Sequence, residues 1–123
     1  MNILLQDVKT ADDIANAKIL IFPGVGSLGV CIDNLHSKGY FDALKAYVNS
    51  GRPFYGICLG MQSLFEGSEE SPGKAGLGVI PGTVARFNDI SVSVPHMGWN
   101  SLRIQRDSPV TGMRRIPILD LPK

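Results

Sequence analysis

The sequence predicts an α/β fold in which a parallel sheet alternates with helices and is followed by an antiparallel β extension. Two observations carry this prediction: short apolar runs alternate with segments of helical periodicity in the first half, and strand-like segments cluster after residue 82. The chain has 123 residues, 44% hydrophobic, and a formal net charge of +1. This composition describes a globular protein with enough chain for a core. The balanced charge disfavours binding to nucleic acid or to an anionic membrane surface.

The chain begins with strand and helix signals. Residues 3–5 form a short apolar run that predicts a strand. Thr10 can cap the helix that follows, and the acidic residues after it suit the first turn of that helix. Residues 18–22 form a continuous aliphatic run that ends at Pro23 and Gly24. Such a run is typical of a strand buried on both faces of a parallel sheet.

A second strand and its helix come next. Residues 28–50 have helical spacing with a break at Lys38 and Gly39. Residues 53–57 predict a strand, and residues 59–65 predict a helix because apolar side chains recur at positions 61, 64 and 65. The order is therefore β-α-β, a unit that places two parallel strands in one sheet.

The remaining elements are strands joined by glycine-rich chain. Residues 66–82 predict a loop, because glycines interrupt every regular pattern there. The strands of the antiparallel extension are predicted at residues 83–87, 91–94 and 101–104, with Asn88 and Asp89 linking the first two.

Metal and cofactor sites are not indicated. The four side chains that commonly bind zinc, Cys31, His36, Cys58 and His96, lack the paired spacing of a zinc site. Two cysteines provide no disulfide framework, which fits a reducing compartment. We therefore expect no metal and no organic cofactor, and a cytoplasmic location, or a plastid if the source is a plant. No apolar run reaches the length of a membrane span.

Cys58 is the candidate nucleophile. It stands between Gly56 and Gly60 at the predicted turn from strand to helix, which is the pattern of a nucleophile elbow with cysteine in place of serine. Side chains two residues before and after the nucleophile would collide in such a turn, so both positions favour glycine. The helix start stabilises a thiolate, and the amide of Leu59 can face the oxyanion. An ordinary buried cysteine at a strand end explains this short motif equally well.

A second candidate segment follows the other predicted strand. Gly24, Val25 and Gly26 form a glycine-rich loop, and such a loop can direct backbone amides into the crevice beside an elbow. The loop lacks the third glycine of a dinucleotide fingerprint, and no P-loop lysine follows it. We therefore favour an oxyanion loop over a nucleotide site, with a plain tight turn as the alternative.

Five segments in order resemble a known family. Residues 23–27 (PGVGS), 56–62 (GICLGMQ) and 66–70 (EGSEE) resemble class I glutamine amidotransferases. Residues 76–82 (GLGVIPG) and 95–100 (PHMGWN) narrow the resemblance to the glutaminase part of imidazole glycerol phosphate synthase, including its fused form. On this resemblance, residues 1–106 are a partial amidotransferase domain and residues 107–123 a divergent tail.

The resemblance implies a flavodoxin-like sheet, here incomplete, and a role for several residues. Cys58 would attack the side-chain amide of L-glutamine, forming a glutamyl thioester and releasing ammonia. Gln62 and Glu70 would hold the glutamine. The glycine-rich loop at residues 24–26 matches the oxyanion strand of the family.

The resemblance also implies a partner. Ammonia would pass to a cyclase barrel, fused or separate, that makes imidazole glycerol phosphate and an aminoimidazole carboxamide ribonucleotide in histidine biosynthesis. A β-turn with Trp99 as a core anchor is a second interpretation of the segment near the cyclase, and both can hold. The residues expected near the cyclase contact are Pro95, His96, Met97, Gly98, Trp99 and Asn100.

One departure from the family concerns the base. The family uses a later His-x-Glu segment to activate the cysteine, and neither His36 nor His96 is followed by glutamate two positions on. We therefore expect very low turnover from this chain alone. Since both ends of the resemblance look cut, we expect the chain to be a truncated or alternatively spliced product, or a mistaken gene model, of a longer amidotransferase. The alternatives are a non-catalytic fragment that binds a cyclase and another elbow-cysteine α/β protein, which would have no use for both Gln62 and Glu70.

Overall fold

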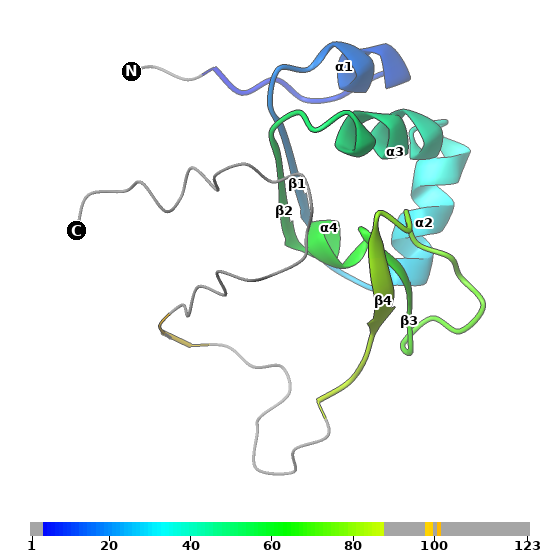
Figure 1. Ribbon diagram of the computed structural model, residues 1–123. Helices are drawn as coiled ribbons and strands as arrows, with labels where there is room; N and C mark the ends of the chain where they lie inside the picture. Colours follow the sequence, from blue (N-terminus) through cyan, green and yellow to red (C-terminus); the bar gives the residue numbers. More distant parts are fainter. Residues whose placement is uncertain (1–3, 88–97, 100, 102–123) are drawn as a thin grey trace. The chain divides into compact units, whose positions relative to one another are not determined.

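A computed structural model of the chain describes residues 4–87, 98–99 and 101 (Figure 1). The chain divides into two units, residues 1–86 and residues 87–123. The helices and strands described below belong to the first unit. In chain order they are α1 (Ala11–Asn16), β1 (Leu20–Gly24), α2 (Leu28–Ser37), α3 (Phe41–Asn49), β2 (Phe54–Cys58), α4 (Leu59–Gln62), β3 (Phe65–Ser68) and β4 (Ile80–Val84).

β1 and β2 pair in parallel, as the β-α-β pattern predicts. Leu20 of β1 stands opposite Phe54 of β2, and Gly24 stands opposite Cys58 at the other end. The expected break between the two connecting helices is also confirmed, because α2 ends at Ser37 and α3 begins at Phe41. The register brings the glycine-rich loop and the cysteine to the same edge of the sheet.

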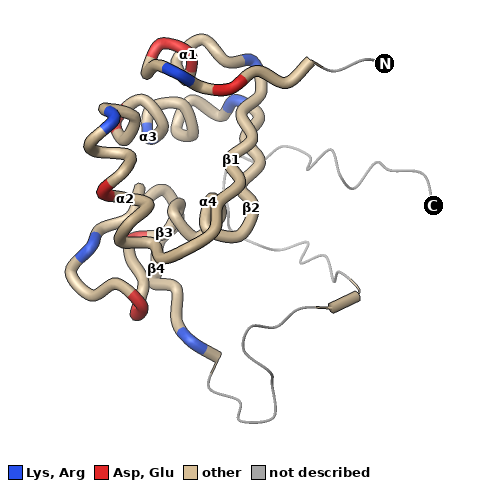
Figure 2. The backbone as a smooth tube through the Cα atoms, turned by 180° about the vertical axis from the view of Figure 1, so that it is seen from behind, with Lys and Arg blue, Asp and Glu red and all other residues tan. Residues whose placement is uncertain are grey.

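The core forms on one side of this strand pair. Neither strand contains a charged residue, and the charged residues of the described chain lie instead on the helices, on the loops and, as Glu66, on β3 (Figure 2). On the other side, Ile19, Ile21, Tyr55 and Ile57 remain 44–66% exposed. The strand expected at residues 18–22 was expected to be buried on both faces. This expectation is wrong for this structure, because the helices cover only one face of β1. The buried core consists of Ile14, Leu20, Leu28, Ile32, Leu35, Leu44, Tyr47, Leu59, Leu64 and Leu77.

The first helix is capped as predicted. The hydroxyl of Thr10 accepts a hydrogen bond from the Asp13 amide, and the Asp13 carboxylate accepts one from the Thr10 amide, which makes a capping box. The strand predicted at residues 3–5 is wrong in its described part. Leu4 and Leu5 are exposed and outside any strand, because an apolar run becomes a strand only where a partner strand receives its hydrogen bonds.

The chain after Cys58 differs most from the expectations. The helix predicted at residues 59–65 has a single turn, α4, and Phe65 instead begins β3. β3 pairs in parallel with β4, so strands occupy part of the predicted loop at residues 66–82. Amides of the intervening chain, including those of Gly76 and Val79, donate hydrogen bonds to carbonyls of residues 64–66. These bonds between distant segments hold glycine-rich chain in place where local pattern indicates only a loop.

The predicted antiparallel extension is described only in part. The strand expected at residues 83–87 ends at Val84, and Phe87 is exposed. Its expected partners at residues 91–94 and 102–104 lie outside the described residues, and Ser101 is not in a strand. Within residues 4–87, no helix is long and apolar enough to cross a membrane.

Candidate active site

Cys58 has the backbone conformation of a nucleophile elbow. It is the last residue of β2 and immediately precedes α4. Its φ of 53° and ψ of −110° make it the one non-glycine residue with positive φ in the described part of the chain. The cysteine is exposed. L-residues avoid such conformations, so the surrounding structure holds Cys58 in a strained turn.

The two glycines that flank the cysteine are required by close backbone packing. A Cβ on Gly56 would lie 2.8 Å from the carbonyl carbon and oxygen of Gly60 and from the amide nitrogen of Met61. A Cβ on Gly60 would overlap the carbonyl oxygen of Phe22 in the neighbouring strand. The collision expected at both positions is therefore present in the structure, and larger side chains would open the turn.

The glycine-rich loop meets the elbow through Gly24. Gly24 stands opposite Cys58 in the parallel register, and a Cβ on Gly24 would lie 3.0 Å from the Cβ of Leu59. The side chain of Leu59 is buried in the core, which anchors the start of α4 directly after the cysteine. Val25 is 93% exposed, and Gly26 has a φ of 107°. The structure therefore brings Gly24, Leu59 and Cys58 together at one edge of the sheet.

The two residues expected to hold glutamine follow the elbow on separate elements. Gln62 is the last residue of α4 and is partly buried. Glu70 is exposed and lies just after β3, where its backbone amide donates to the hydroxyl of Ser68, 3.2 Å away. Their roles in binding stay predictions.

The remaining cysteine and one histidine lie on α2, and the other histidine lies outside the described residues. Cys31 is on α2, and burial raises the pKa of its thiol. The ring of His36 stacks on Phe41 with centroids 4.1 Å apart, consistent with a packing role. His96 lies outside the described residues, as do Pro95, Met97 and Asn100.

Two residues of the expected cyclase-facing segment are described. Gly98 and Trp99 are both exposed, and the relative exposure of Trp99 is 107%. The interpretation of Trp99 as a core anchor is therefore wrong in this structure.

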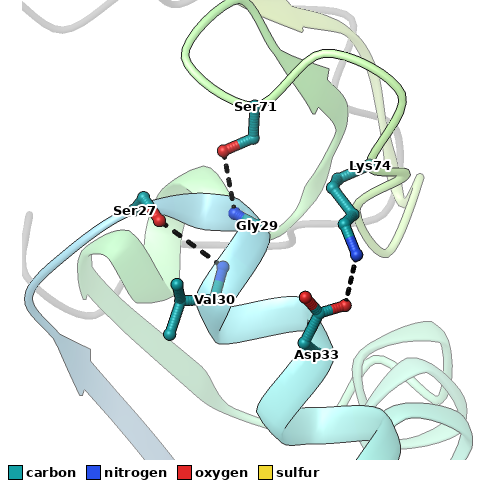
Figure 3. A network of polar contacts seen from close by, with 6 residues as sticks. All are labelled: Ser27, Gly29, Val30, Asp33, Ser71 and Lys74. Atoms are coloured by element: carbon teal, nitrogen blue, oxygen red, sulfur yellow. Dashed lines mark hydrogen bonds and ion pairs between the residues drawn. The ribbon is translucent and has the colours of Figure 1, made fainter.

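Sequence reasoning missed one polar contact of the site. The hydroxyl oxygen of Ser71 accepts a hydrogen bond of 2.9 Å from the backbone amide of Gly29, near the start of α2 (Figure 3). Ser71 directly follows Glu70 in the chain, and α2 directly follows the glycine-rich loop and Ser27. A serine next to Pro72 indicates only a turn, so the local sequence contains no signal of this distant contact.

Comparison with known proteins places this geometry in a family. The profile described as "Glutamine amidotransferase class-I" matches residues 2–116. The chain is 50% identical over 107 residues to "Imidazole glycerol phosphate synthase hisHF, chloroplastic" of Arabidopsis thaliana, covering 86% of this chain and 18% of that protein. It is 47% identical over 103 residues to "Imidazole glycerol phosphate synthase hisHF" of Schizosaccharomyces pombe, covering 84% of this chain and 19% of that protein.

Similar proteins also occur as separate subunits. The chain is 47% identical over 103 residues to "Imidazole glycerol phosphate synthase subunit HisH" of Syntrophotalea carbinolica, covering 79% of this chain and 50% of the subunit. It therefore spans about half the length of such subunits, and less than a fifth of the hisHF proteins named above. These matches exclude an unrelated elbow-cysteine protein. With its strained Cys58 between Gly56 and Gly60, the chain belongs to the class I glutamine amidotransferase family.

Proposed function

We propose that this chain carries the glutamine-hydrolysing nucleophile of an imidazole glycerol phosphate synthase, and that Cys58 is that nucleophile. The observation that supports the proposal best is the exposed Cys58, held at positive φ directly opposite Gly24. A nucleophile elbow presents its side chain to substrate in this way, and a neighbouring glycine loop offers backbone amides to a developing oxyanion.

The proposed reaction has two balanced steps. The Cys58 thiolate forms a bond to the side-chain carbonyl carbon of L-glutamine, and the C–N bond of the resulting tetrahedral adduct breaks. The leaving nitrogen takes up a proton and departs as ammonia, which leaves a glutamyl thioester. Water then adds to the thioester carbonyl, and breaking the C–S bond releases glutamate and restores the thiol.

Amides at the carboxyl edge of the sheet would stabilise the oxyanion in this reaction. The proposed donors are the backbone of the loop at residues 24–26 and the amide of Leu59, with Gln62 and Glu70 holding the substrate. The proposed oxyanion donors are supported by the register of β1 and β2 and by the close packing of Gly24 on Leu59. Donors fixed before the reaction stabilise developing charge without reorganising.

Neither histidine of this sequence matches the proton-transfer group that the resemblance implies. The ring of His36 stacks on Phe41, and neither His36 nor His96 belongs to a His-x-Glu segment. A thiol needs a base, and the leaving ammonia needs a proton. The 123-residue chain by itself is therefore expected to form a covalent adduct with a reactive glutamine analogue and to turn over glutamine very slowly.

The proposed acceptor of ammonia is a cyclase barrel of imidazole glycerol phosphate synthase, fused or separate. The support is the naming of similar proteins as hisHF and as subunit HisH. The cyclase would use the ammonia to make imidazole glycerol phosphate and an aminoimidazole carboxamide ribonucleotide. The proposed location is the cytoplasm, or a plastid as in the chloroplastic relative.

The test is covalent labelling of Cys58 by a glutamine analogue that carries a diazoketone in place of the carboxamide. Intact mass should show one adduct on the wild-type chain and on Cys31→Ser, and none on Cys58→Ser. L-glutamine should protect against labelling, whereas D-glutamine should not. Adduct formation on Cys58→Ser, or labelling that L-glutamine leaves unchanged, would show that Cys58 is not the glutamine nucleophile.

A second candidate function is a non-catalytic module that binds the cyclase, and the full exposure of Trp99 favours it. Exposed tryptophans frequently anchor protein interfaces. Binding of the chain to a purified cyclase barrel should weaken in Trp99→Ala, and Phe87→Ala provides a matched control at another exposed aromatic side chain. Binding by a Cys58→Ser chain that has lost labelling would separate this function from the catalytic one.

A further inference from the structure

The turn that contains Glu70 is hydrogen-bonded to α2, the helix that follows the glycine-rich loop. The hydroxyl oxygen of Ser71 accepts a hydrogen bond from the backbone amide of Gly29 at 2.9 Å, across 42 positions of the chain. Figure 3 shows the Ser71 side chain directed at the first turn of α2. The contact therefore links two segments that border the proposed glutamine site.

The Gly29 amide needs a partner from outside its own helix. Amides in the first turn of a helix have no carbonyl one turn earlier to donate to. The first intrahelical bond of α2 runs from the Cys31 amide to the Ser27 carbonyl, and the Ser27 hydroxyl accepts from the Val30 amide at 3.5 Å. Ser71 thus acts as a second cap of α2, supplied from a distant turn.

The contact between Ser71 and Gly29 is closely packed. Gly29 is buried, and a Cβ at this position would lie 3.1 Å from the Ser71 hydroxyl oxygen and 3.3 Å from the Ser71 Cβ. A second contact joins the same two segments at the surface, where Lys74 Nζ lies 2.6 Å from Asp33 Oδ1. Those side chains are 45% and 60% exposed, so the ion pair contributes little to stability.

Ser71 also belongs to the turn that fixes Glu70. The Glu70 amide donates to the Ser68 hydroxyl, and the Ser71 amide donates to the Ser68 carbonyl at 3.1 Å. The Lys74 amide in turn donates to the Ser71 carbonyl at 3.2 Å. Since these bonds hold the backbone on both sides of Glu70, a shift of Ser71 would move Glu70 with it.

We infer that Ser71 is a positioning residue that sets the place of Glu70 relative to the glycine-rich loop, through its hydrogen bond to Gly29. The inference rests on the proposed function, in which Glu70 holds glutamine and the loop at residues 24–26 stabilises the oxyanion. Without the hydroxyl, the buried Gly29 amide loses its partner and the turn is free to shift. Glutamine recognition then weakens, whereas Cys58 stays exposed and reactive.

The test compares two reagents on the full 123-residue chain. The diazoketone glutamine analogue reports recognition, and iodoacetamide reports the reactivity of Cys58 alone. Ser71→Ala should raise the L-glutamine concentration that half-protects Cys58 by about tenfold, the equivalent of one lost hydrogen bond to a buried amide. Its rate of iodoacetamide labelling at Cys58 should match the wild-type rate. Ser71→Thr, which keeps the hydroxyl, should restore protection.

Two variants separate positioning from general stability. Lys74→Ala removes the surface contact between the same two segments and should leave protection unchanged. Gly29→Ala places a methyl group against the Ser71 hydroxyl while raising helix propensity, so it should reproduce the loss even if Ser71→Ala fails to fold. Wild-type protection in Ser71→Ala or Gly29→Ala, or an equal loss in Lys74→Ala, would overturn the inference. Failure of L-glutamine to protect the wild-type chain would instead overturn the proposed function itself, and the positioning role with it.

Discussion

Gly60 of α4 lies against the carbonyl oxygen of Phe22 in β1, so closely that a Cβ on the glycine would overlap that oxygen. The turn after Cys58 therefore packs backbone to backbone against the neighbouring strand. The oxygen is a backbone atom of β1, which is paired with β2, so it cannot move aside as a flexible side chain would. The tight turn at Cys58 therefore depends on the absence of a side chain at position 60.

Gly60→Ala is expected to destabilise the chain by about 3 kcal/mol or more, because the added methyl group pushes the strand and the turn apart. Urea unfolding followed by circular dichroism measures the change. Gly67→Ala is the matched control, since a Cβ there would lie 3.4 Å from its nearest neighbour, at ordinary contact distance. Equal stability of Gly60→Ala and the wild type would show that the turn is wider than the structure has it.

Cys58→Gly is expected to be more stable than Cys58→Ala by roughly 1–3 kcal/mol, the usual cost of holding a non-glycine residue in a sparsely populated conformation. Both changes remove the thiol, so their difference isolates the backbone strain at a φ of 53°. The free energy of unfolding in urea provides the measurement. Cys31→Gly and Cys31→Ala serve as the control pair, and there alanine should be the more stable because Cys31 lies within a helix. A glycine at position 58 that destabilises relative to alanine would contradict the strained elbow.

Cys58 is expected to react with iodoacetamide faster than Cys31 near pH 8. Burial raises the pKa of the Cys31 thiol, and only the thiolate is a nucleophile, so Cys31 needs a higher pH before it reacts. Cys58 is exposed, so the reagent reaches its thiol directly. Mass spectrometry of Cys31→Ser and Cys58→Ser gives the two rates separately as a function of pH. Faster labelling of Cys31 below pH 9, with the fold intact by circular dichroism, would refute the assignment of Cys31 as the packing cysteine.

Arg52→Lys is expected to cost about 1–2 kcal/mol of stability, because a lysine cannot replace a guanidinium that bonds several acceptors at once. Arg52 donates to the carbonyl of Ala15 at 2.6 Å and to the hydroxyl of Ser50 at 2.9 Å, and it lies 4.1 Å over the ring of Tyr47. Thermal melting measures the loss. Lys38→Ala is the control, since Lys38 lies 6.0 Å from the centroid of the Tyr40 ring. A melting temperature equal to the wild type would show that these bonds contribute nothing net.

The carboxyl of Asp13 is expected to titrate below its ordinary pKa of 3.8. The hydrogen bond from the backbone amide of Lys9 lowers this pKa most, and the bonds from the hydroxyl and the amide of Thr10 lower it further. A lowered pKa contributes stability that is present above the ordinary pKa and is lost as pH falls through the folded value. Carboxyl carbon NMR gives the midpoint. Thr10→Ala should move this midpoint back towards 3.8, because the alanine removes the hydroxyl and keeps the amide. An unchanged midpoint in Thr10→Ala would contradict the contact between the Thr10 hydroxyl and the Asp13 carboxylate.

Local chemistry was enough to predict the elbow and its supports. The pattern Gly56, Cys58, Gly60 predicts a strained turn because only glycine fits two residues on either side, and the structure has that turn. The cap at Thr10 and the break after α2 also follow from side chains close in sequence. The roles of Gln62 and Glu70 in binding stay predictions.

The sequence by itself determined the parallel strand pair and the place of Cys58 at its edge, because periodicity and glycine spacing act through neighbouring residues. Only the tertiary structure decided that β3 and β4 pair within glycine-rich chain, that one face of β1 stays exposed, and that Ser71 caps α2. These features depend on hydrogen bonds and packing between segments far apart in the chain. Such contacts form only when the core has brought both segments together, so neither segment contains their signal alone.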